Sequence, residues 1–203
     1  MLKFVAALVV ILIGSGSALA KSATLLVLGD SLAAGYGLPA NDAFPAKLEE
    51  ALKAKYPGIR IMNGGVSGDT AADGLARMDW ALTDEVTGLI VELGGNDALR
   101  GLGVGQTEAA LSAILSKAKA RGVPVLVLGM KAPPNMGADY VAAFDGIYAR
   151  LAAEYQALFY PFFLDEVAAD PAVNQADGIH PNAKGVDIIV SKVLPKVEEL
   201  ITK

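Results

Sequence analysis

The chain has 203 residues, of which 53% are hydrophobic, and it carries a formal net charge of −5 at pH 7. This length suggests one domain with a substantial core, and the apolar content is too high for a disordered chain. The acidic balance argues against nucleic acid as a partner and against tight binding to anionic membranes. Because the sequence has no cysteine, it excludes disulfides, thiolate metal sites, a cysteine nucleophile and lipid attachment through an N-terminal cysteine.

Residues 1–20 have the pattern of a secretory signal peptide. Lys3 is followed by a short apolar stretch, small residues and the motif Ala-Leu-Ala at 18–20. The apolar stretch is too short for a membrane span of about 20 residues. We therefore predict cleavage after this motif, a single mature domain over 21–203 without a stable membrane anchor, and a periplasmic or secreted location. An uncleaved anchor is the alternative. Cleavage removes Lys3 from the 17 basic residues, and the remaining 16 against 22 acidic residues give a net charge of −6.

After this segment, short β-prone runs alternate with longer helical stretches. The predicted strands are 24–28, 59–63, 89–93, 123–128 and 157–163. The predicted helices are about 44–56, 69–80, 111–121, 139–155 and a last one that begins near 183. Proline inside a helix disrupts it, so we expect Pro195 to kink or divide the last helix.

The alternation of strands and helices predicts an α/β fold. Near-continuous apolar strands are typical of a parallel sheet that is buried on both faces. We therefore expect a three-layer α/β/α architecture, with a flavodoxin-like parallel sheet of about five strands and helices on both faces. The flavodoxin-like strand order is taken by analogy.

Polar residues gather where these strands end. Ser31 follows the first strand in a Gly-Asp-Ser-Leu turn, Gly68 follows the second, and Asn96 follows the third. Asp177 and the single histidine, His180, precede the last helix. Because the carboxyl ends of parallel strands share one edge of the sheet, these residues can meet in one crevice.

This set of residues suits acyl transfer. The hydroxyl of Ser31 would need a neighbouring base, and His180 is the candidate because histidine as a residue type titrates near neutral pH. Asp177 can accept from the other ring nitrogen and fix the tautomer. The backbone N–H groups of Ser31 and Gly68 and the side-chain amide of Asn96 are candidate donors to a developing oxyanion.

Each of these residues also has a structural interpretation. Ser31 can be a turn residue or a helix cap, Asn96 a turn residue, Gly68 a left-handed turn glycine, and His180 an ordinary surface residue. Three acids beside them are expected to be caps and loop braces: Asp30, Asp69 and Asp97. One histidine and no cysteine argue against a zinc site.

The four motifs together resemble the SGNH hydrolases, also called the GDSL esterase/lipase superfamily. The signature residues correspond to Ser31 in Gly-Asp-Ser-Leu, Gly68 in Ser-Gly-Asp-Thr, Asn96 in Gly-Gly-Asn-Asp and His180 in Asp-Gly-Ile-His-Pro. The chain is most similar to the bacterial periplasmic group of multifunctional acyl-thioesterases, lysophospholipases and arylesterases. The resemblance implies a flavodoxin-like fold, no cofactor and no metal, and a triad completed by Asp177.

We therefore expect a serine esterase that acts on small carboxylic esters through an acyl-enzyme. Aryl and short-to-medium acyl esters are the leading substrates, with acyl-thioesters and lysophospholipids as further candidates. A transacylase or a cell-wall sugar O-deacetylase with the same site is the alternative, and a non-catalytic periplasmic binding module is a third interpretation. Residues of the loop after the fourth strand can line an acyl groove, although packing alone would also explain them: Met130, Pro133, Pro134 and Met136. The resemblance implies that this loop is mobile.

Overall fold

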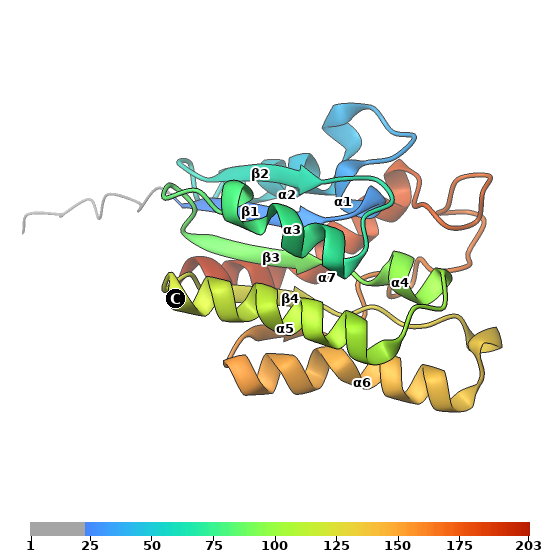
Figure 1. Ribbon diagram of the computed structural model, residues 1–203. Helices are drawn as coiled ribbons and strands as arrows, with labels where there is room; N and C mark the ends of the chain where they lie inside the picture. The colour runs from blue at the N-terminus through green and yellow to red at the C-terminus, as the bar shows by residue number, and fades with distance from the viewer. Residues whose placement is uncertain (1–22) are drawn as a thin grey trace, which may run out of the picture.

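The computed structural model describes residues 23–203, so the predicted signal peptide lies outside the described residues. A sheet of five strands is covered on both faces by helices, which gives three layers (Figure 1). The strand order is β2-β1-β3-β4-β5, and every neighbouring pair is parallel. This is the flavodoxin-like order, so the predicted fold class is confirmed.

The strands are short and mostly buried. Their bounds are Thr24–Gly29 for β1, Arg60–Gly65 for β2, Gly88–Glu92 for β3, Val125–Leu128 for β4 and Leu158–Tyr160 for β5. All residues of β3 and β4 are buried, as expected for inner strands that are covered on both faces. The last strand is shorter than predicted because Pro161 follows it and has no N–H to continue the ladder.

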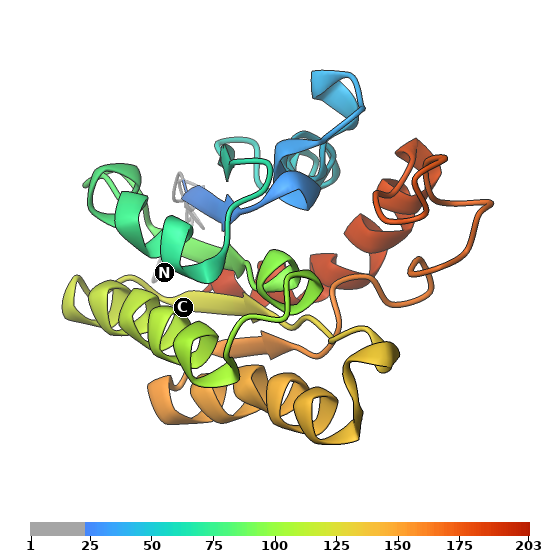
Figure 2. The ribbon, with the colours of Figure 1, turned by 45° about the vertical axis from the view of Figure 1, so that its right-hand side comes forward.

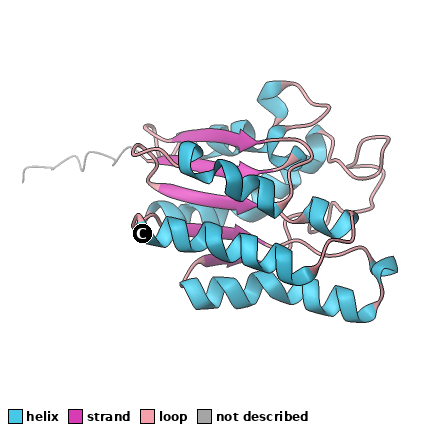
Figure 3. Cartoon of the chain, viewed as in Figure 1, coloured by secondary structure: helices cyan, strands magenta, loops and turns pink. Residues whose placement is uncertain are grey.

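Helices cover the two faces of the sheet in separate groups, as the cartoon in Figure 3 shows. One layer consists of α3 (Ala71–Ala81), α5 (Val104–Ala120) and α6 (Ala138–Tyr155), and the other contains α2 (Phe44–Lys53) and α7 (Ala183–Ile201). Two short helices follow strands directly: α1 (Ser31–Ala34) and α4 (Gly95–Leu99). Two 3₁₀ turns complete the helical segments: η1 (Ala40–Asp42) and η2 (Pro134–Met136).

The last helix corrects one sequence prediction. Pro195 does not divide α7, which is assigned as one helix of 19 residues. Val193 and Val197, on either side of the proline, are fully buried. Burial of the apolar face on both sides outweighs the loss of one backbone hydrogen bond, because tertiary packing supplies most of a helix's stability.

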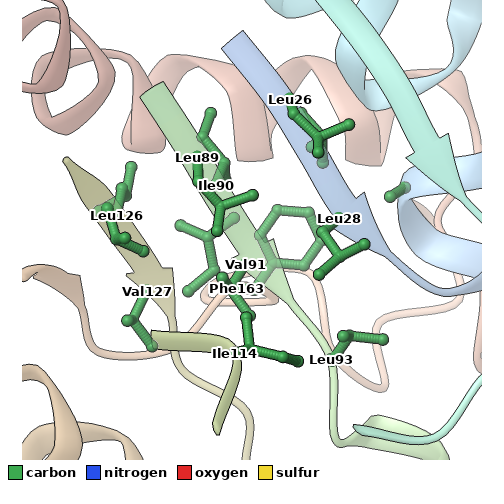
Figure 4. Packing of buried hydrophobic residues seen from close by; sticks show 14 of the residues in the cluster. Leu26, Leu28, Leu89, Ile90, Val91, Leu93, Ile114, Leu126, Val127 and Phe163 are labelled. Atoms are coloured by element: carbon green, nitrogen blue, oxygen red, sulfur yellow. The ribbon is translucent and has the colours of Figure 1, made fainter. Parts of the chain in front are cut away.

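The core fills the space between the sheet and the helices. Figure 4 shows Leu89, Ile90 and Val91 of β3 among side chains of β1 and β4, with Ile114 of α5 and Phe163 nearby. Close packing of this kind makes the sheet a rigid support. The carboxyl ends of its strands, on the right in Figure 1, therefore hold the loops that follow them in defined positions.

Candidate active site

Three of the sequence-predicted residues lie within hydrogen-bonding distance at the carboxyl edge of the sheet. His180 Nε2 lies 2.9 Å from Ser31 Oγ, and His180 Nδ1 lies 2.7 Å from Asp177 Oδ2. With its proton on Nδ1, the imidazole donates to Asp177 and its Nε2 accepts from the Ser31 hydroxyl. The structure thus brings together a hydroxyl, a base and a carboxylate from segments about 150 residues apart in the chain.

A tight turn between β1 and α1 places Ser31. Asp30 caps the short helix, because its Oδ1 accepts from the N–H of Leu32 at 3.0 Å. Gly29 has no room for a side chain, since an added Cβ would lie 2.6 Å from both Ala33 Cβ and Glu92 Oε2. The glycine allows α1 to start directly on the strand, so that the serine faces the sheet edge.

The loop before α7 holds His180 through Asp177. The Asp177 carboxylate accepts from the N–H of Ile179 at 2.9 Å, from the N–H of His180 at 3.0 Å and from the imidazole. These hydrogen bonds, the two backbone ones first, lower the pKa of Asp177 to about 2. The carboxylate is therefore ionised throughout the neutral range and can orient the imidazole.

Hydrogen bonds from Gln175 also hold the segments of the serine and the histidine together. The side chain of Gln175 donates to the carbonyls of Tyr36 at 2.7 Å and Pro181 at 3.0 Å, and its backbone N–H donates to the carbonyl of His180. The exposed ring of Tyr36 lies 4.5 Å from the imidazole, centroid to centroid. Neither residue was predicted from the sequence, because a contact between distant segments leaves no local pattern.

Two of the predicted oxyanion donors are backbone N–H groups. Within residues 23–203, the N–H groups of Ser31 and Gly68 donate no hydrogen bond to another residue. Gly68 has a φ of +89°, a conformation that favours glycine. The Asn96 amide nitrogen, by contrast, donates to Asp30 Oδ2 and to the Asp69 carbonyl, both at 3.0 Å. A ligand oxygen would share or replace one of these two acceptors.

Asp30, Asp69 and Asp97, which were predicted to be caps and loop braces, have these structural roles. Besides Asp30, which caps α1, Asp69 accepts from Arg77 Nε at 2.6 Å, and the same guanidinium donates to the carbonyl of Gly29 at 2.8 Å. Asp97 accepts from the N–H of Ala71 at 2.9 Å. These bonds link the loops after β1, β2 and β3 to one another.

Tyr148 braces the loop after β3 from below. Its buried hydroxyl donates to the carbonyl of Leu93 at 3.1 Å. Gly94 follows with a φ of +106°, and a Cβ there would collide with the Tyr148 hydroxyl. The glycine is thus required both by its conformation and by the tyrosine beneath it. This contact helps to position Asn96, two residues later.

Glu92, at the end of β3, is a buried acid that the sequence analysis missed. Its Oε2 accepts from the N–H of Asp30 at 3.2 Å, whereas its Oε1 has no hydrogen-bond partner among residues 23–203. Burial, and next the charge of Asp30, raise the pKa of Glu92 well above its usual value. Burial also raises the pKa of Asp30 to about 6. Its burial could have been predicted from the sequence, because this glutamate stands within the apolar run Leu-Ile-Val-Glu-Leu.

The four candidates for an acyl groove are placed differently from one another. Met130 is buried and belongs to the core. Its methyl group would lie 3.2 Å from a Cβ on Gly95, so it supports the start of α4. Pro133 and Met136 are half-buried and Pro134 is exposed. Met130 therefore packs beneath the site, and the other three lie nearer to the surface.

Comparisons with known proteins show which family this chain is similar to. Residues 27–188 match the model of the GDSL-like Lipase/Acylhydrolase family. The chain is 40% identical over 183 residues to "Esterase TesA" of Pseudomonas aeruginosa, with 90% of this chain and 91% of that protein covered. It is equally identical over 183 residues to "Thioesterase 1/protease 1/lysophospholipase L1" of Escherichia coli K12, of which 86% is covered. Among solved structures, "AlinE4, a SGNH-hydrolase family esterase" is 48% identical with a TM-score of 0.75, and the alignment covers 88% of this chain and 96% of that one.

Proposed function

Because the chain belongs to the GDSL-like lipase/acylhydrolase family and is an ester-hydrolysing serine hydrolase, we propose that it acts through an acyl-enzyme on Ser31. The observation that carries this proposal is the hydrogen-bonded line from Ser31 through His180 to Asp177. The N–H groups of Ser31 and Gly68, which donate to no other residue among 23–203, support it further.

In the first half of the reaction, Ser31 Oγ attacks the ester carbonyl while His180 Nε2 takes the hydroxyl proton. The carbonyl oxygen becomes an oxyanion, which accepts from the N–H groups of Ser31 and Gly68 and from the Asn96 amide. The bond between the carbonyl carbon and the alcohol oxygen then breaks, and His180 returns the proton to the leaving alcohol.

In the second half, water takes the place of the alcohol. His180 removes a proton from the water as its oxygen attacks the acyl carbon, and the proton then passes to Ser31 Oγ as the acid leaves. Asp177 stays ionised throughout, since its pKa is about 2, and it stabilises the imidazolium that forms in each half. The reaction consumes only the ester and water.

The loop after β4 supplies the residues that we expect to contact the substrate. We propose that Pro133, Pro134 and Met136 line the path of the acyl chain, because they are apolar and at least partly accessible. We also propose cleavage of the signal peptide after Ala20 and a periplasmic or secreted location. No helix within 23–203 has the length and hydropathy that a bilayer crossing requires.

A Ser31→Ala variant tests the proposal. With p-nitrophenyl butyrate, kcat should fall by about a thousandfold or more, because the nucleophile is removed. Circular dichroism should stay unchanged, since within residues 23–203 the hydroxyl hydrogen-bonds only to His180. Ser191→Ala, which removes a hydroxyl from the surface of α7, is the matched control and should keep full activity. Hydrolysis by Ser31→Ala near the wild-type rate would refute the proposal.

A further inference from the structure

The aromatic ring of Tyr36 lies against the imidazole of His180, although the two residues come from different loops. The ring centroids are 4.5 Å apart, and the ring planes are tilted by 36°. Rings that meet edge to face are close to perpendicular, so at this distance and tilt the two rings overlap face to face with an offset. Tyr36 therefore presents the π face of its ring to the imidazole.

The backbone holds Tyr36 in this position, although the residue is exposed. Its N–H donates to the carbonyl of Ser31 at 3.1 Å, and its own carbonyl accepts from Gln175 at 2.7 Å. The glycines on both sides, Gly35 and Gly37, have φ values of +80° and +73°. A Cβ on Gly37 would also collide with the side chain of Gln175. The place of the ring is therefore set by the serine turn and by the segment that carries the histidine.

Two carboxyl groups also act on the imidazole. Asp177, on the same loop, lies 2.7 Å from Nδ1. Asp30, in the turn after β1, interacts with the charge of His180, which opposes the rise that burial gives to the pKa of Asp30. The side chain of His180 is only 18% exposed. A charged imidazole therefore loses much of its contact with water and depends on these neighbours and on the ring of Tyr36.

The imidazole becomes a cation twice in the proposed reaction, first with the proton of Ser31 and then with a proton of water. A cation over the face of an aromatic ring, within about 6 Å of its centroid, is attracted by the negative charge of that face. The imidazole of His180 lies within this range. Because the neutral imidazole is not attracted in this way, the ring stabilises the state that forms along the reaction more than the resting state.

We propose that the ring of Tyr36 stabilises the imidazolium of His180 in both halves of the reaction. This inference rests on the proposed function of Ser31. Tyr36 acts through His180 rather than on the substrate, so it is a positioning residue. Its effect should appear in kcat and not in KM, because the imidazolium forms only after the substrate has bound. The effect on kcat does not depend on which half of the reaction is slower, since both halves pass through the imidazolium.

The first test compares substitutions that keep or remove the π face. Tyr36→Leu leaves an apolar side chain beside the imidazole but no ring. With p-nitrophenyl butyrate, its kcat should fall by about fivefold, the size expected for such a contact, while KM stays unchanged. Tyr36→Phe keeps the ring and should recover most of this loss. Trp80→Leu removes an exposed ring near the C-terminal end of α3, so it is the matched control and should keep full activity.

The second test separates the charge of the ring face from the shape of the ring. Phenylalanines with one, two and three fluorines on the ring are incorporated at position 36. Each fluorine withdraws negative charge from the π face, while the ring stays nearly the same size. The value of kcat should fall stepwise along this series, and KM and the free energy of unfolding should stay unchanged.

A constant kcat along the fluorine series would mean that the ring only packs against the imidazole, and would overturn the proposal. A rise in the KM of Tyr36→Leu at unchanged kcat would overturn it too, because the ring would then bind the substrate. So would a Tyr36→Phe variant as slow as Tyr36→Leu, since the hydroxyl would then carry the effect. If the wild type hydrolyses p-nitrophenyl butyrate and Tyr36→Leu matches it, this inference fails and the function of Ser31 stands; if the wild type does not hydrolyse the ester, both fail.

Discussion

Glu92 shows, at the scale of a single residue, how the site departs from what stability alone would favour. It is fully buried, lies next to Asp30, and leaves one oxygen without a hydrogen-bond partner within residues 23–203. A buried acid without a cationic partner is costly in its charged form, so burial favours the protonated form of Glu92. Such a residue at the base of the serine turn is typical of a functional site, where stability is commonly given up.

We expect Glu92→Gln to stabilise the protein, and to do so more at high pH. Because its pKa is raised, Glu92 keeps its proton to a higher pH in the folded state than in the unfolded state, where the ordinary pKa is 4.5. The wild type therefore loses stability as the pH rises above this value, by about 1.4 kcal/mol per pH unit while Glu92 stays neutral. Gln does not titrate, and its amide oxygen can still accept from Asp30.

The measurement is the free energy of unfolding in urea for both proteins between about pH 5 and pH 8. Glu50→Gln, at an exposed position on α2, is the control and should show no such trend. A difference between Glu92→Gln and wild type that stays constant over this range would contradict the assignment of a neutral Glu92.

Asn96 carries a separate prediction, because its amide already donates to Asp30 and to the Asp69 carbonyl. If the amide also donates to the oxyanion, Asn96→Ala should lower kcat on p-nitrophenyl butyrate by about a hundredfold. Asn135→Ala, on an exposed part of the loop after β4, should have no effect. A loss below about threefold would leave Asn96 as a brace between loops rather than a donor to the reaction.

At this scale the sequence was informative where a residue sits in a recognisable motif. Ser31 follows a strand in a Gly-Asp-Ser-Leu turn, and Asp177 and His180 stand three residues apart before a helix, so local pattern pointed to all three. Gln175 has no such setting. Its importance comes from its contact with Tyr36, and that contact exists only once the strands are ordered.

At the scale of elements, apolar spacing predicted the long helices and most strands well. The predicted helix 69–80 corresponds to α3, and its N-cap Thr70 forms a capping box with Asp73. The short helices α1 and α4 were missed, because four or five residues cannot establish a helical period. In α7, Pro195 does not divide the helix, because the apolar face on both sides of the proline is buried.

At the scale of elements, we predict how the N-cap of α3 contributes to stability. Thr70→Ala should lower the free energy of unfolding by about 1 kcal/mol, because the N–H of Asp73 loses its acceptor. Thr83→Ala, at an exposed turn just beyond α3, should change it by less than about 0.5 kcal/mol. Equal effects of the two substitutions in thermal or urea unfolding would show that the capping box contributes nothing.

At the scale of the whole molecule, the strand order brings the loops that carry the site residues together. Figure 2, turned by 45° from Figure 1, shows the loops that follow the strands gathered at one end of the sheet, with α4 among them. Alternating elements and apolar strands predicted this architecture, and the order β2-β1-β3-β4-β5 agrees with the analogy. The side-chain distances at the site could not be predicted, since they depend on packing between segments far apart in the chain.

We propose that this assembly makes Ser31 an activated nucleophile. The direct measurement is the mass of the intact protein, followed by peptide mapping, after exposure to a fluorophosphonate at neutral pH. A single adduct on Ser31 is expected in the wild type, with labelling slowed by about a thousandfold or more in His180→Ala, because the base is gone. Labelling of Ser31→Ala at the wild-type rate, or labelling of Ser31 that is equally fast without His180, would contradict the account.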